Sequence, residues 1–140
     1  MSAWTCPACQ RLFGRRGQSH LCAPAMTLDE YFATGPAFER PIFDAVLPVL
    51  EDVAGQPLHV EPVAVGIFVK HERSWVELRP LTRWVALSFP LRDPPALRRI
   101  ARRIRGSGGV TWCVVNLGAP GEVDAEVRAL LEQSYLDTLR

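Results

Sequence analysis

The stretch VGIFVKHERSWVELRP, residues 65–80, decides the fold. Apolar and polar residues alternate on both sides of its HER tripeptide, as they do in two strands joined by a turn. Another alternating run, RWVALSFPL at 83–91, follows after only two residues. Connections this short favour antiparallel pairing, because parallel neighbours need a long crossover. The stretch therefore predicts the centre of an antiparallel sheet.

Working outward, LHVEPV at 58–63 and VTWCVVNL at 110–117 are further candidate strands. Helical patterns lie on both sides of the strands. We expect them at about 27–34, 37–53, 94–105 and 124–139. Strands that follow one another directly, with helices before and after, indicate an α+β domain. The predicted fold is an antiparallel sheet of about four to five strands packed with three to four helices.

Local signals set the helix boundaries. Thr27 and Glu30 form a capping box for the first helix. Pro48 lies inside the second helix, where it should kink the helix or split it in two. Asp93 and Gly106 are expected to begin and end a third helix, whose stripe is Leu97, Ile100, Ala101 and Ile104.

Size and composition are those of an ordinary globular chain. The 140 residues are 48% hydrophobic and 22% charged, with a net charge of +1, so bulk charge indicates no partner. No apolar run reaches the ~20 residues that cross a bilayer, and no secretory signal is visible. We expect a cytoplasmic protein without membrane contact. Cysteines stay reduced there, so clustered cysteines suggest metal rather than disulfides.

The N-terminal stretch TCPACQRLFGRRGQSHLC, residues 5–22, carries the strongest chemical signal. Its candidate metal ligands are Cys6, Cys9, His20 and Cys22. Thiolate and imidazole suit tetrahedral zinc, and a segment of about 25 residues needs a metal to hold its fold. Four protein ligands leave no open position, which favours structural zinc. His20 and Cys22 are two apart, so we expect them on an extended or turned segment rather than a helix.

Alternation gives the central strands two faces. One is apolar, with Ile67, Val69, Val76, Leu78, Val85, Leu87 and Phe89. The other mixes aromatic and charged residues: Phe68, Lys70, Trp75, Glu77, Arg79 and Trp84. If that face is exposed, Lys70, Trp75, Arg79 and Trp84 could bind a small molecule or peptide. If instead a helix or the zinc segment covers it, the cations lie at its edges.

Arginines form two local clusters. Those considered for nucleic-acid binding are Arg11, Arg15, Arg16, Arg98, Arg99, Arg102 and Arg103. The second cluster would occupy the polar side of the 94–105 helix, so it is either a phosphate-binding surface or a solvated face.

Catalytic motifs are weak. Cys113 lies in an apolar strand and reads as an inert buried thiol, and His59 and His71 have no motif partners. We therefore expect a non-enzymatic, zinc-binding protein that binds nucleic acid. The alternatives are a small-molecule or peptide module and a protein–protein adaptor or homodimer.

CPACQRLF resembles the opening of small zinc fingers with three Cys ligands and one His. More of the chain resembles an uncharacterised bacterial family of unknown function. The matching stretches are residues 5–22, TLDEYFATG, residues 65–80 and EVDAEVRALLEQSYL. That family's core also occurs in proteins labelled "predicted transport protein". The resemblance implies a zinc-binding head, residues 1–25, before an α+β domain, residues 26–140.

Overall fold

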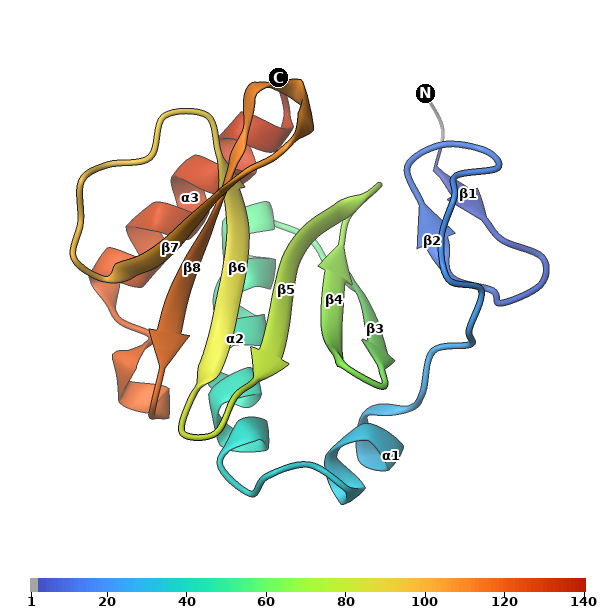
Figure 1. The fold of residues 1–140 in the computed structure, drawn as a ribbon, viewed down its shortest axis with the longest axis horizontal. Coiled ribbons are helices and arrows are strands. Elements are labelled where there is room, and N and C mark those ends of the chain that lie inside the picture. Colours follow the sequence, from blue (N-terminus) through green and yellow to red (C-terminus); the bar gives the residue numbers. More distant parts are fainter. Residues whose placement is uncertain (1–2) are drawn as a thin grey trace.

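A six-stranded antiparallel sheet forms the centre of the protein (Figure 1). The structure is a computed structural model and describes residues 3–140. Along the sheet the strand order is β3-β4-β5-β6-β8-β7. The strands are β3 (His59–Val63), β4 (Gly66–Lys70), β5 (Ser74–Pro80), β6 (Val85–Leu91), β7 (Ile100–Arg105) and β8 (Thr111–Leu117). The α+β class and antiparallel sheet are confirmed.

Two helices cover one face of this sheet. The α-helices of residues 3–140 are α1 (Leu28–Ala33), α2 (Glu39–Ala54) and α3 (Ala125–Thr138). Figure 1 shows α2 and α3 behind the strands and α1 near the β3 end of the sheet. The apolar strand face meets these helices: Ile67, Leu87 and Phe89 are fully buried. The predicted apolar face is thus the core face.

Helix α1 begins as its sequence predicts. The Thr27 side chain accepts from the Glu30 backbone N–H, and the Glu30 carboxylate accepts from the Thr27 N–H. Helix α2 runs unbroken through Pro48, so the expected split is wrong. Pro48 has no N–H to donate to the Asp44 carbonyl. Pro48 and Asp44 are both exposed, so water can satisfy that oxygen.

The expected helix over 94–105 is wrong. Residues 100–105 form strand β7, and Ile104 pairs with Trp112 of β8. Gly108 and Gly109 adopt positive φ, which lets the chain reverse between the two strands. Pairing with β8 outweighs the helical spacing of the apolar residues, a local preference that tertiary contacts can override. This strand takes the main sheet to six, one more than expected.

An irregularity in strand pairing places Trp75 in the core. Val69 pairs with Val76 but Lys70 pairs with Ser74, so Trp75 is an extra residue in β5. Such a bulge interrupts the alternation of side chains. Trp75 is fully buried, and its indole N–H donates to the Ser134 hydroxyl of α3 at 3.1 Å. Alternation alone had placed Trp75 on the opposite face.

The head lies beside the β3 edge of the sheet (Figure 1). It contains a small antiparallel pair, β1 (Trp4–Thr5) and β2 (Leu12–Phe13). The following linker runs along β3, where the Met26 N–H donates to the Pro62 carbonyl at 2.8 Å. Within residues 3–140, no helix is both long and apolar enough to cross a membrane.

Candidate metal centre

The first pair of candidate ligands lies on a tight turn between β1 and β2. The Gln10 N–H donates to the Cys6 carbonyl at 2.7 Å, and the Cys6 N–H donates to the Arg11 carbonyl at 2.9 Å. Gln10 has φ of 66°, a left-handed conformation that lets the chain reverse here. The turn brings the sulfurs of Cys6 and Cys9 to the same side.

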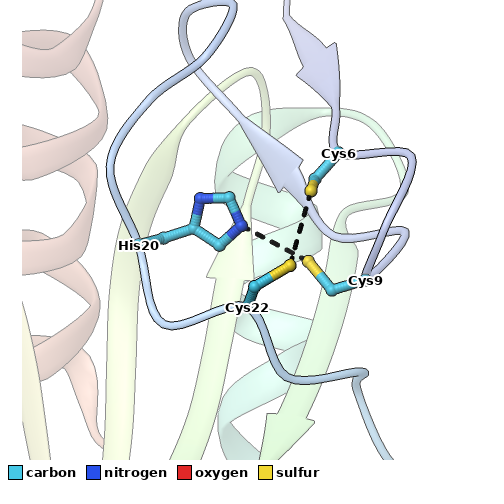
Figure 2. Close-up of side chains that lie close together, drawn as sticks. All are labelled: Cys6, Cys9, His20 and Cys22. Carbon is cyan, nitrogen blue, oxygen red and sulfur yellow. Dashed lines mark hydrogen bonds between the residues drawn. The ribbon is translucent and has the colours of Figure 1, made fainter.

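The second pair lies on a non-helical segment, as its i,i+2 spacing predicts, and the Ala23 N–H donates to the Leu21 carbonyl at 2.9 Å, so the chain turns at Cys22. His20 Nδ1 lies 2.6 Å from the Gln18 carbonyl, to which it can only donate. The neutral ring then carries its lone pair on Nε2, the nitrogen that faces the cysteines (Figure 2). Gln18 therefore orients His20 so that Nε2 points toward the cysteines.

The four candidate ligand atoms lie close enough together to hold one metal ion. The sulfurs of Cys6 and Cys22 are 3.7 Å apart, and Cys9 Sγ lies 3.5 Å from His20 Nε2 (Figure 2). All four atoms lie within 4.8 Å of one another. Tetrahedral zinc, with Zn–S near 2.3 Å and Zn–N near 2.0 Å, requires separations of about 3.8 Å and about 3.5 Å. The cluster could therefore hold a metal ion.

Thiol ionisation also suits a cation at this point. A hydrogen bond from the Cys9 backbone lowers the pKa of Cys6 to about 6. Interaction with Cys6 raises the pKa of Cys22 to about 11. One thiolate forms readily, and its charge opposes ionisation of the next sulfur. A divalent cation among the sulfurs removes that opposition.

Aromatic packing supports the centre from one side. The rings of Phe13 and His20 are stacked, with centroids 3.9 Å apart and planes at 28°. Trp4 lies beside both rings. Phe13 is buried, so it is the apolar plug that the small head needs beside its ligands.

A buried ion network fastens the head to β3 and β4. Glu61 Oε1 lies 3.0 Å from Arg11 Nε and 2.8 Å from Lys70 Nζ. The Leu12 N–H donates to Glu61 Oε2 at 2.7 Å, and Lys70 donates to the Leu12 carbonyl at 2.7 Å. Glu61 is not among the site residues predicted above, although an acid flanked by apolar residues in a strand is a usable signal. Arg11 is buried in this network, so it is not available to the nucleic-acid surface considered above.

The other arginines differ in their surroundings. Arg99 lies 2.6 Å from Asp124 and 3.6 Å from Glu126, which makes it part of the contact with α3. Arg103 donates to the Pro95 carbonyl. The exposed arginines of the set are Arg15, Arg16, Arg98, Arg102 and Arg103. The two clusters therefore lie on different elements, the head and β7 with its preceding loop.

The four residues considered for small-molecule binding are not gathered in one place. Lys70 is buried beneath the head and Trp75 in the core. Arg79 is exposed and paired with Glu77 at 2.8 Å. Trp84 is partly exposed in the turn before β6. The head thus covers one end of this face and leaves the rest open.

Comparisons with protein-family models, curated proteins and solved structures found no match for the chain. The resemblance to the uncharacterised bacterial family and the division at residue 25 therefore stay predictions.

Proposed function

We propose that the protein is a non-catalytic zinc protein that binds single-stranded nucleic acid on the uncovered face of its sheet. The separations of the four ligand atoms support the zinc. With every position taken by a protein side chain, the ion would be structural. It would hold the β1–β2 turn, with Cys6 and Cys9, to the segment of His20 and Cys22. This would present Arg11 and Leu12 to Glu61.

A metal assay with matched cysteine variants tests the zinc. Protein purified without chelator or added metal is expected to contain one zinc per chain. Cys22→Ser should lose the zinc, whereas Cys113→Ser should keep it because Cys113 lies in the core under the sheet. A wild-type protein without zinc, or an equal loss in both variants, would contradict the zinc centre.

The uncovered sheet face carries the nucleic-acid proposal. A cross-strand row on this face runs through Phe68, Glu77, Ser88, Val114 and Arg102. Beside that row, Trp112 is partly exposed, and its neighbour Ile104 is 46% exposed. Phe68 and Trp112 line a shallow hollow of about 220 Å³ on this face. We call the surface formed by these residues the open face.

Aromatic rings and arginines on one sheet face suit single strands better than duplexes. Unpaired bases stack on exposed aromatic rings, and cations beside them meet the phosphates. Arg102 lies on the open face, and Arg103 and Arg105 line a second hollow with Pro94 at the same sheet edge. Arg98 is exposed in the loop that leads into β7. This edge places cations on both sides of β7.

Binding to labelled oligonucleotides at several salt concentrations tests this function. We expect single-stranded DNA or RNA to bind more tightly than a duplex, with affinity that falls steeply as salt rises. Arg102→Gln should weaken binding and reduce the salt slope by about one. Arg83→Gln, at an exposed arginine in the β5–β6 turn, is the control and should change little. Absence of binding at low salt would overturn the proposal.

A protein partner or a homodimer is the second candidate. Strand β7 is the outer strand of the sheet, and five of its six residues are exposed. An exposed edge strand can pair with a strand from another chain. Light scattering over a range of protein concentrations distinguishes this function, because a homodimer doubles the measured mass without nucleic acid.

A further inference from the structure

A polar cleft of about 680 Å³ lies where the head, the β4–β5 turn and the end of α3 meet. The head supplies Gly14, the turn supplies Arg73, and α3 supplies Thr138. A Cβ on Gly14 would lie 2.9 Å from Arg73 Cβ, so the head backbone closely approaches this turn. In Figure 1 the turn lies between the head and the C-terminus. The docked head therefore forms one wall of the cleft.

Positive charge predominates in the cleft lining. Its cationic side chains are Lys70, Arg73 and Arg140, its imidazoles are His59 and His71, and its acid is Glu72. Behind the lining, Glu61 pairs with Lys70 and lies 2.8 Å from His59 Nε2. That carboxylate neutralises Lys70 and leaves Arg73 as the fixed cation of the turn. A concave surface lined mainly by cationic side chains attracts anions.

Hydrogen bonds to Thr138 hold His71 and Arg73 in place. The Thr138 hydroxyl donates to the Tyr135 carbonyl at 2.6 Å, so its oxygen accepts from His71 Nε2 at 3.2 Å. Arg73 Nη2 donates to the Thr138 carbonyl at 3.4 Å. The other guanidinium N–H groups of Arg73 keep their capacity to donate to a ligand, and guanidinium binds phosphate in a bidentate manner. Side chains ordered in advance lose less entropy on binding.

An aromatic wall adjoins these polar groups. The Tyr135 ring lies against His71, with centroids 5.5 Å apart, and against Trp75 at 5.1 Å. Tyr135 is partly exposed and lines the cleft. The volume is within the range of about 300–1,000 Å³ typical of small-molecule sites. We propose that the cleft binds a small organic phosphate, with the phosphate at Arg73 and the organic group against Tyr135.

Amide NMR titration of the full zinc-loaded chain tests this site. The probes are adenosine 5′-monophosphate and inorganic phosphate, with adenosine and sodium chloride as controls at matched ionic strength. We expect the two phosphate probes to shift amides of residues 70–73 and 135–139 and the controls to leave them unchanged. The monophosphate should bind more tightly than inorganic phosphate because of its contact with Tyr135. Equal shifts with chloride, or shifts confined to other regions, would overturn the site.

Variants locate the phosphate. Arg73→Met keeps the aliphatic stem beside Gly14 and should weaken monophosphate binding at least about tenfold, which corresponds to ~1.4 kcal/mol. Arg83→Met, at an exposed arginine outside the cleft, is the matched control and should bind as the wild type does. If Arg73→Met loses zinc or its folded spectrum, Arg73→Lys supplies the test, because it keeps the stem beside Gly14 and the positive charge and removes the bidentate guanidinium group. Wild-type affinity in the folded variant would overturn the proposal.

The cleft and the open face can be tested separately. Arg102→Gln should weaken oligonucleotide binding and leave monophosphate binding unchanged, whereas Arg73→Met should do the reverse. Monophosphate binding that depends on Arg102 would place the ligand on the open face and overturn the cleft site.

Discussion

Glu61 Oε1 lies 2.8 Å from Lys70 Nζ, and both side chains are at most 2% exposed. Burial lowers the pKa of Lys70. Burial alone would raise the pKa of Glu61, but hydrogen bonds from Lys70, the Leu12 N–H and Arg11 outweigh it and lower that pKa. The charged form of Glu61 is therefore stabilised by its surroundings, whereas burial disfavours the charged form of Lys70. Around it, two strands of the sheet and the head share one polar network.

Glu61→Gln is expected to loosen the head from the sheet. The change leaves Arg11 and Lys70 buried without their counter-charge, and breaking a buried pair costs about 3–5 kcal/mol. We expect lower thermal stability and faster amide exchange in residues 11–13, measured by calorimetry and NMR.

Glu77→Gln is the matched control for this change. Its partner Arg79 is exposed, and a surface pair contributes less than about 1 kcal/mol. Equal destabilisation by the two variants would show that the Glu61 network does not hold the head.

Acid should weaken the contribution of Glu61. Its folded pKa lies below the usual 4.5, so the folded state binds fewer protons than the unfolded state around that pH. The stabilisation is complete well above pH 4.5 and is lost as pH falls through the folded pKa. We expect the difference in unfolding free energy between wild type and Glu61→Gln to shrink steadily below pH 4.5 in urea titrations. A difference independent of pH would contradict this linkage.

Glu39→Gln is expected to stabilise the protein at neutral pH. Glu39 is buried, accepts a 2.5 Å hydrogen bond from Tyr31 on Oε2, and has no partner for Oε1 in residues 3–140. Burial raises the pKa of Glu39 above 4.5, so the folded protein loses stability as pH rises through that raised pKa.

The gain from Glu39→Gln should be on the order of 1 kcal/mol at pH 7 and should disappear near pH 4, where the carboxyl is neutral. Urea denaturation at both pH values measures it. Glu51→Leu at the other end of α2 would remove the acceptor of the Leu58 N–H and serves as the opposite control, expected to destabilise. Destabilisation by Glu39→Gln at pH 7 would show that the charged form is favoured.

Thiol reactivity should separate the cysteines into two groups. Zinc would protect Cys6, Cys9 and Cys22, whereas burial protects Cys113 and raises the pKa of its thiol. We expect no fast-reacting thiol in the zinc-loaded protein, three after chelation, and the fourth only with denaturant. Ellman's reagent measures the count. Reaction of Cys113 on chelation alone would mean that the main domain opens when the head loses its metal.

The ligand set and the core face could be predicted from residue spacing. Two cysteines three apart and a His–Cys pair two apart need only local backbone geometry to point at one centre, and strand alternation repeats every two residues. Arg11 could not be placed in this way. Its partner Glu61 is fifty residues away in the chain, and an arginine between metal ligands looks the same whether its surroundings are solvent or a buried carboxylate.

By itself, the sequence determined the four candidate metal ligands, the capping box of α1 and the antiparallel strands around residues 65–91. Each depends on neighbours within a few residues or on short connections. Only the tertiary structure decided that residues 100–105 form a strand, that Trp75 turns into the core, and that Glu61 binds the head. These outcomes depend on β8, on the β4–β5 register and on the docked head, because long-range pairing and burial outweigh local preference where the two disagree.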